Sequence, residues 1–112
     1  MSRTLILGGA GFIGSNLTHA LVSRGVRPRI FTRPGYALAN IDDVLQQVDV
    51  FYGDFMDDVA LREATRDVDT VYHLISTTFP GMTLESSVYD VLSNLLPTIR
   101  LLECCIANGV RK

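Results

Sequence analysis

Short apolar runs alternate along the chain with segments of helical periodicity. After the first run, Ile13, Leu17 and Leu21 recur four residues apart, which places them on the inward face of a helix that Gly25 ends. Short, continuously apolar strands are typical of a parallel sheet that helices cover on both faces. The apolar runs predict strands at residues 5–7, 29–32, 48–52 and 70–75.

Three further helices are predicted between and after these strands. Shorter helices are expected at residues 38–46 and 57–66. A long helix is expected from about Leu84 to Asn108. Pro97 should kink this helix or split it in two, because proline lacks an N–H group and clashes with the preceding turn. The residues of the second short helix that are expected to face inward are Val59, Leu61 and Ala64.

Strands that alternate with helices imply right-handed crossover connections and an α/β fold. The 112 residues suffice for one domain, and because 47% of them are apolar, a buried core is expected. The predicted sheet has about four parallel strands in the order 3-2-1-4. A ligand site is expected beyond the carboxyl ends of strands 1 and 4, where the strand order reverses.

Three glycines, Gly8, Gly11 and Gly14, stand between the first strand and the first helix. Gly8 permits a tight turn, Gly11 leaves room for a pyrophosphate to approach the backbone, and Gly14 lets the helix pack closely. The N–H groups of the first helical turn, which includes Phe12 and Ile13, then face the phosphates at the positive end of the helix dipole. The pattern predicts a dinucleotide site, and a Walker-type loop is excluded because no Gly-Lys-Ser/Thr follows.

The segment 8–14 resembles the opening of the extended short-chain dehydrogenase/reductase family, the NAD(P)-dependent nucleotide-sugar epimerases and dehydratases. Three later segments, at residues 52–57, 71–76 and 94–103, resemble the same family in the same order. The resemblance implies a partial Rossmann fold in which an aspartate after strand 3 binds the adenine amino group. It also implies that the end of strand 4 lines the cofactor and that a helical asparagine lies near the nicotinamide side. The residues concerned are Asp54, Phe55, Leu74, Ile75, Ser76 and Asn94.

The resemblance implies proton transfer by a tyrosine that has a lysine four residues later. No tyrosine of this chain has one, since the only lysine is Lys112. Residues 1–112 are therefore predicted to form a single NAD(P)-binding Rossmann domain that ends before strand 5 and the substrate-binding region, with no catalytic residue of its own. A bare edge on strand 4 and the long final helix predict either self-association, for instance as a homodimer, or marginal stability.

The second strand bears on the choice of cofactor. An NAD enzyme of this type places an acidic residue about 20 residues past the glycines, on the ribose 2′-hydroxyl. This chain has no acidic residue between Ser15 and Ile41, and Thr32 stands where the acid is expected. Arg33 follows and can pair with a 2′-phosphate. The sequence therefore favours NADP slightly over NAD.

Three functions remain open. The first is the cofactor half of a nucleotide-sugar epimerase or dehydratase similar to UDP-glucose 4-epimerase, with a nucleotide sugar as substrate of the whole enzyme. The second is a non-catalytic NADP-binding sensor or scaffold module. The third is a reductase of the same superfamily, of the flavonol or steroid type.

Composition excludes other classes. A net charge of −2 gives no general attraction to nucleic acid or anionic membranes, and no apolar run reaches the roughly 18 residues of a membrane span. No secretory signal is expected at the N-terminus, and no residue cluster has metal-site spacing. Cys104 and Cys105 are expected to pack in the core rather than form a disulfide, which fits a reducing cytoplasm. His73, among apolar neighbours, is expected to be structural.

Overall fold

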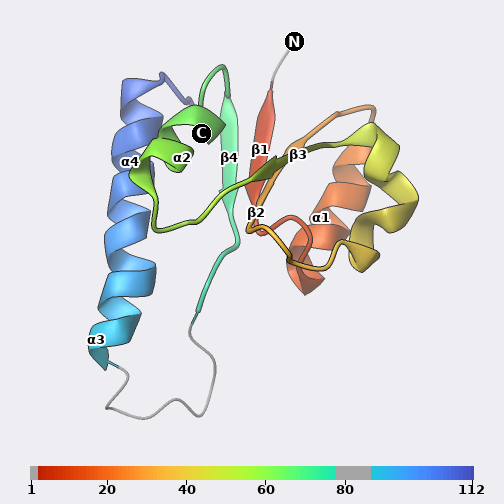
Figure 1. Ribbon diagram of the computed structural model, residues 1–112. Coiled ribbons are helices and arrows are strands. Elements are labelled where there is room, and N and C mark those ends of the chain that lie inside the picture. Colours follow the sequence, from red (N-terminus) through yellow and green to blue (C-terminus); the bar gives the residue numbers. More distant parts are fainter. Residues whose placement is uncertain (1–2, 78–86) are drawn as a thin grey trace.

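A computed structural model describes residues 3–77 and 87–112. Its strands form one parallel sheet in the order β3-β2-β1-β4, which confirms the predicted topology (Figure 1). In the register of the central strand, Ile6 lies between Ile30 of β2 and Tyr72 of β4. The strands are β1 (Thr4–Leu7), β2 (Arg29–Thr32), β3 (Asp49–Tyr52) and β4 (Thr70–His73).

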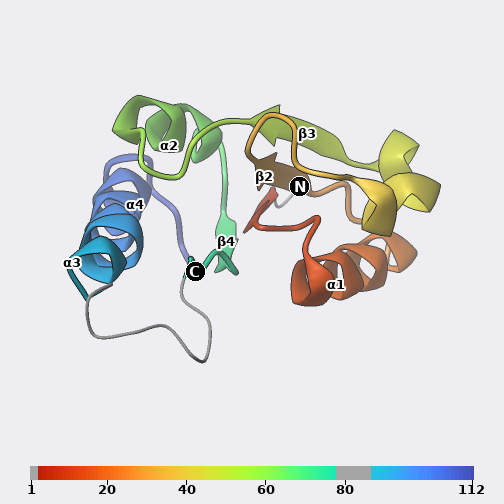
Figure 2. The same ribbon diagram turned by 60° about the horizontal axis from the view of Figure 1, so that its bottom comes forward.

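Helices cover both faces of the sheet (Figure 2). Side chains of a strand point alternately to its two faces, so successive residues of β1 enter different cores. Leu5 and Leu7 pack with α2 and α4, whereas Ile6 packs on the side of α1 and η1. All three are fully buried. The covering elements are α1 (Phe12–Ser23), the 3₁₀ helix η1 (Ala39–Gln47), α2 (Asp58–Ala64) and α4 (Leu96–Ala107).

Two residues predicted to face inward are exposed. The exposed fraction is 68% for Ile13 and 60% for Val59, so the prediction was wrong at both positions. Each residue lies in the first turn of its helix, whereas Leu17 and Leu61, further along the same helices, pack against the core. Periodicity identifies the inward face of a helix, but it does not show how far the sheet extends beneath that face.

The final helix changes type before Pro97. α3 (Ser87–Asp90) runs into η3 (Val91–Leu95), a π-helical turn, which is followed by α4. A proline ring clashes with the carbonyl four residues earlier, which here belongs to Ser93, and a wider turn relieves such a clash. The predicted split therefore takes the form of a π turn. The predicted start at Leu84 lies outside the described residues.

The last residues of the chain run beside the outer edge of β4. The N–H groups of Arg111 and Lys112 donate to the Asp69 carbonyl, and the Val71 N–H donates to the Lys112 carbonyl at 2.8 Å. The predicted bare edge is thus covered at its beginning. Among the helices that the structure describes, none combines the length and the apolar character needed to cross a membrane.

One exposed polar pair joins α1 to η1. His19 Nε2 lies 2.8 Å from a carboxylate oxygen of Asp43, and His19 Nδ1 lies 2.7 Å from the Ser15 carbonyl. Both partners are acceptors, so the protonated imidazole satisfies both contacts. The hydrogen bond to Asp43 is the main reason that the pKa of His19 is raised, and the Ser15 carbonyl adds to the effect.

The raised pKa predicts a pH-dependent contribution to stability. It is fully present below the ordinary histidine pKa of 6.5 and is lost as pH rises through the raised value. We expect Asp43→Asn to lower the urea midpoint at pH 6 and to change it little at pH 9. Asp42→Asn, on the same exposed turn, is the matched control and should change neither. An equal loss from Asp43→Asn at both pH values would contradict the prediction.

The loop between β1 and α1 is held by two close contacts. Gly8 has a φ of +81°, and a Cβ there would lie 2.8 Å from the Leu74 carbonyl oxygen. At Gly14, a Cβ would overlap the Gly8 carbonyl oxygen. A third glycine that the sequence reading did not use, Gly9, has the same property, because its Cβ would lie 2.7 Å from Ile30 Cδ1. Three glycines of this loop are therefore required by the protein's own packing.

We expect Gly14→Ala to destabilise the fold by about 1–3 kcal/mol, the usual cost of overpacking, although alanine is the better helix former. Gly11→Ala is the matched control, since its methyl group would meet nothing closer than 3.4 Å. It should cost less than about 0.5 kcal/mol, as for an unconstrained site. Urea unfolding followed by circular dichroism measures both, and similar losses would refute the distinction.

Candidate functional site

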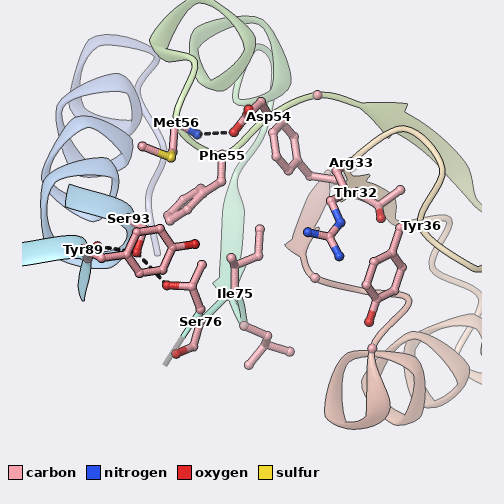
Figure 3. Close-up of a pocket in the computed structure, with 16 residues that line it drawn as sticks. Thr32, Arg33, Tyr36, Asp54, Phe55, Met56, Ile75, Ser76, Tyr89 and Ser93 are labelled. Atoms are coloured by element: carbon pink, nitrogen blue, oxygen red, sulfur yellow. Dashed lines mark hydrogen bonds between the residues drawn. The ribbon is translucent and has the colours of Figure 1, made fainter. Parts of the chain in front are cut away.

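A cavity of about 400 Å³ opens where the carboxyl ends of the strands meet (Figure 3). Segments that follow β1, β2, β3 and β4 all contribute to its wall, because parallel strands end at the same edge of a sheet. The cavity therefore lies at the predicted edge. The predicted site residues that line it are Gly8, Gly11, Thr32, Arg33, Asp54, Phe55, Leu74, Ile75 and Ser76.

The other predicted site residues lie beside or behind this wall. Phe12 and Ile13 stand in the first turn of α1, and neither lines the cavity. Their backbone N–H groups, at the open end of the helix, are their candidates for a ligand contact. At Gly14, the space that a side chain would need is filled by the Gly8 carbonyl group. Asn94 lies on η3, where its side chain bonds to Thr77.

Gly11 differs from the other glycines of the loop. Its φ of −74° is available to any residue. A Cβ at this position would lie 3.4 Å from the Gly8 carbonyl oxygen and 3.8 Å from the Tyr36 hydroxyl, which are ordinary contacts. The fold itself thus accepts a side chain here, and the position faces the cavity. A glycine at this point keeps space free next to the helix N-terminus.

The N-terminus of α1 is open to an anion. By helix geometry the first N–H groups, including those of Phe12, Ile13 and Gly14, have no carbonyl partner within the helix. No side chain caps the helix, and its first turn contains no acidic residue. The helix dipole adds a partial positive charge at this end. The free N–H groups and the partial positive charge at this end of α1 therefore suit a phosphate group.

The loop after β3 presents Asp54 and Phe55 to the cavity. One carboxylate oxygen of Asp54 accepts a hydrogen bond from the Met56 N–H at 2.8 Å, which fixes the side chain. Phe55 is 8% exposed, and its ring lies 5.0 Å from that of His73. Asp54 therefore offers a fixed acceptor beside an apolar ring, an arrangement that suits a base with an amino group.

His73 supports this wall from behind. Its Nδ1 accepts the Ile75 N–H at 3.4 Å, which leaves Nε2 to donate to Thr98 Oγ1 at 2.9 Å. This is the bonding of a neutral imidazole. Burial lowers the pKa of His73, which also favours the neutral form. These contacts agree with the structural role expected from the sequence.

The wall opposite Arg33 contains Tyr89 and Ser93, which were not among the predicted site residues. The Thr77 N–H donates to Asn94 Oδ1 at 2.8 Å, and Asn94 Nδ2 donates to Thr77 Oγ1 at 2.7 Å. The hydroxyl of Ser93, fully buried, donates to the Tyr89 carbonyl at 2.6 Å. These bonds tie the end of β4 to the π turn and place Thr77, Tyr89 and Ser93 against the cavity. In the sequence, the residue that could have indicated this wall is Pro97, which was predicted only to kink or split the final helix.

Arg33 and Tyr36 form the wall on the β2 side. The Arg33 guanidinium lies over the Tyr36 ring, 5.4 Å from its centroid (Figure 3). Tyr36 was not among the predicted site residues. Within the described ranges, no group of three His, Cys, Asp or Glu residues is arranged to hold a metal ion. The site therefore offers backbone N–H groups, one guanidinium, one carboxylate and apolar surface.

Comparisons with known proteins agree with this geometry. The chain is 31% identical to sterol demethylase protein B of Methylococcus capsulatus over 97% of its length, and 29% identical to a UDP-glucose 4-epimerase of Halalkalibacterium halodurans over 96%. It spans 32% of the length of each relative. A solved structure, Thermus thermophilus UDP-glucose 4-epimerase in complex with NAD, matches with a TM-score of 0.83 and 32% identity, covering 96% of this chain and 35% of that one.

The model of one family, the NAD dependent epimerase/dehydratase family, matches residues 4–112. The match covers all four strands and every described helix. The order of the strands and the glycine-rich loop are those that the sequence resemblance implied. The chain belongs to the NAD dependent epimerase/dehydratase family.

Proposed function

We propose that residues 1–112 form a single cofactor-binding domain of an NAD(P)-dependent nucleotide-sugar epimerase or dehydratase similar to UDP-glucose 4-epimerase. The observation that carries the proposal is Gly11. Neither its backbone conformation nor its neighbours require a glycine, whereas a ligand phosphate at the helix N-terminus does. The match to an epimerase structure that contains NAD supports the same assignment.

The proposed placement of the cofactor follows from the polarity of the wall. We assign the pyrophosphate to the N–H groups at the start of α1 and the adenine amino group to Asp54. Leu74, Ile75 and Ser76 would line the cofactor along the end of β4, where the branched side chain of Ile75 narrows the channel. Asn94 would act on the nicotinamide side through Thr77, which it fixes.

The bound nicotinamide supplies a hydride acceptor and donor. The residues of this chain bind and orient it, but none provides a tyrosine with a lysine four positions later. We therefore expect the 112-residue chain to show no turnover of a nucleotide sugar. A non-catalytic sensor or scaffold role is distinguished by whether a longer polypeptide that contains this chain turns over substrate.

We propose NADP over NAD as the preferred cofactor. Thr32 occupies the end of β2, where an acidic residue would select the ribose 2′-hydroxyl, and it is 5% exposed. Arg33 lines the cavity next to it and can donate to a 2′-phosphate. The NADP-to-NAD affinity ratio before and after Arg33→Ala tests this choice. A ratio that favours NAD in the wild type, or that Arg33→Ala leaves unchanged, would overturn it.

A second candidate is an enzyme of the same superfamily that acts on sterols. It is favoured by the 31% identity to sterol demethylase protein B, which is similar to the identity with the epimerase relative. The two candidates share the cofactor half and differ in the substrate. Assays of a longer polypeptide with UDP-glucose and with a 3-hydroxysterol separate them.

We further propose a cytoplasmic location and no nucleic-acid or membrane partner. Cys104 and Cys105 are both free thiols, as is usual in a reducing compartment. Burial is the main reason that the pKa of each thiol is raised, so neither is a reactive thiolate. The net charge of −2 gives no general attraction to a polyanion.

We also propose that the chain forms a homodimer through the outer face of its last helix. Apolar residues recur there at alternating spacings of four and three, the pattern that packs against a second helix with the same repeat. Their exposed fractions run from 44% for Ile99 to 81% for Ile106. The stripe consists of Val88, Leu92, Leu95, Ile99, Leu102 and Ile106.

Sedimentation over a dilution series measures this association. We expect the wild type to dissociate on dilution, and Leu102→Asp to shift the equilibrium toward monomer by tenfold or more, since an interface charge without a partner costs roughly 2 kcal/mol or more. Glu103→Gln, beside the stripe, is the control. A wild type that is monomeric at all concentrations would contradict the proposal.

We expect the chain to bind a dinucleotide at the glycine loop. Gly11→Val places a branched side chain where the pyrophosphate lies and should weaken binding at least tenfold, whereas Gly11→Ala should weaken it less. Calorimetric titration with NAD and NADP measures both variants, with circular dichroism as a check on folding. If the wild type and Gly11→Val bind equally well, the dinucleotide site does not lie at this loop.

A further inference from the structure

The segment Arg33-Pro34-Gly35-Tyr36 is a tight turn at the rim of the cavity. The Tyr36 N–H donates to the Arg33 carbonyl at 3.2 Å, and Gly35 has a φ of +82°. Proline second and glycine third, with a positive φ at the glycine, are the requirements of a type II turn. Such a turn brings its first and fourth residues close together. The turn therefore sets Arg33 beside Tyr36.

The contact with the Tyr36 ring leaves the Arg33 guanidinium available to a ligand. Arg33 lies over the Tyr36 ring at 5.4 Å, within the range of a cation–π contact. A guanidinium carries five N–H donors, and a contact with an aromatic ring takes up no acceptor, so N–H groups remain to bind a ligand. In the described part of the chain, Arg33 has no carboxylate partner, whereas nearby Arg27 bonds to Asp49 and Arg29 to the Ala64 carbonyl. Arg33 is thus held by a ring instead of an acceptor.

The Tyr36 ring extends from the turn toward the glycine loop. Tyr36 is 40% exposed, and its hydroxyl lies 3.8 Å from the position of a Cβ at Gly11, so it reaches the glycine loop. The chain after the turn is joined to the same loop, because Asn40 Nδ2 donates to the Ala10 carbonyl at 3.2 Å. Figure 3 shows Arg33 and Tyr36 side by side on one wall of the cavity. The turn and the glycine loop therefore line one continuous side of the cavity.

We propose that Tyr36 is a positioning residue for cofactor selection: its ring holds the Arg33 guanidinium with its N–H edge toward the 2′-phosphate of NADP. The inference rests on the proposed dinucleotide function and adds the residue on which the selectivity of Arg33 depends. Without the ring, Arg33 is a long side chain on an exposed turn, and ordering it on binding costs conformational entropy.

The test compares 2′,5′-ADP with 5′-AMP, two probes that differ only in the 2′-phosphate. Titrations of the 112-residue chain followed by amide NMR signals give both dissociation constants. We expect the wild type to prefer 2′,5′-ADP about tenfold, as for one charge-assisted contact. Tyr36→Leu should lower this preference roughly two- to fivefold, as for loss of an exposed cation–π contact. Tyr36→Phe keeps the ring and should restore the preference.

Coupling to Arg33 separates positioning from a merely structural role. Arg33→Ala should abolish the preference, and Tyr36→Leu added to it should change the ratio no further. Gly35→Ala leaves both side chains in place but strains the turn, so it should also lower the preference. Gly25→Ala is the matched control, because Gly25 has a φ of +81° and lies away from the cavity.

Each negative result of these titrations would overturn a different part of the proposal. If the wild type binds neither probe, nor NAD or NADP, the proposed dinucleotide function fails and the inference fails with it. If it binds both probes equally, Arg33 does not select a 2′-phosphate. If the preference exists and Arg33→Ala abolishes it while Tyr36→Leu leaves it intact, only the role of Tyr36 is overturned.

Discussion

The contact between Gly14 and the carbonyl of Gly8 determines where the site can form. A side chain at residue 14 would overlap that carbonyl oxygen, so α1 can begin at this point only because the position is a glycine. The contact brings the helix N-terminus directly above the end of β1, the fully buried central strand. Its free N–H groups then face the edge of the sheet at which the loops after the other strands converge. The remaining features of the cavity are arranged around this fixed end.

The two walls of the cavity are held by different kinds of interaction. On the β2 side, a four-residue turn sets Arg33 against Tyr36 through local geometry. On the β4 side, hydrogen bonds between Thr77 and Asn94 join segments 17 residues apart. The first wall is exposed and cationic, and the second is more buried and polar. This difference suits a ligand whose charged end lies toward β2 and whose other end requires a defined orientation.

The π turn connects the proline to the second wall. In an ordinary α-helix, the ring of Pro97 would clash with the carbonyl of Ser93, four residues earlier. The wider π turn relieves this clash. The same turn carries Ser93, which is fully buried, and Asn94, which binds Thr77. Pro97 thus stands next to the contacts that fix the end of β4. Its replacement by glycine or alanine would change the wall as well as the helix.

The sequence by itself determined the strands and the glycine loop, because these depend on short-range patterns, and the strand order followed from the fold that alternating strands and helices imply. Short apolar runs mark the strands, and glycines at 8, 11 and 14 mark the turn into α1. Only the tertiary structure decided that Ile13 and Val59 are exposed and that Tyr36 and Ser93 face the cavity. It also showed that Gly14 is required by packing, whereas Gly11 is not. The reason is physical: periodicity and turn chemistry are local, but burial and contact depend on which distant segments lie opposite each residue.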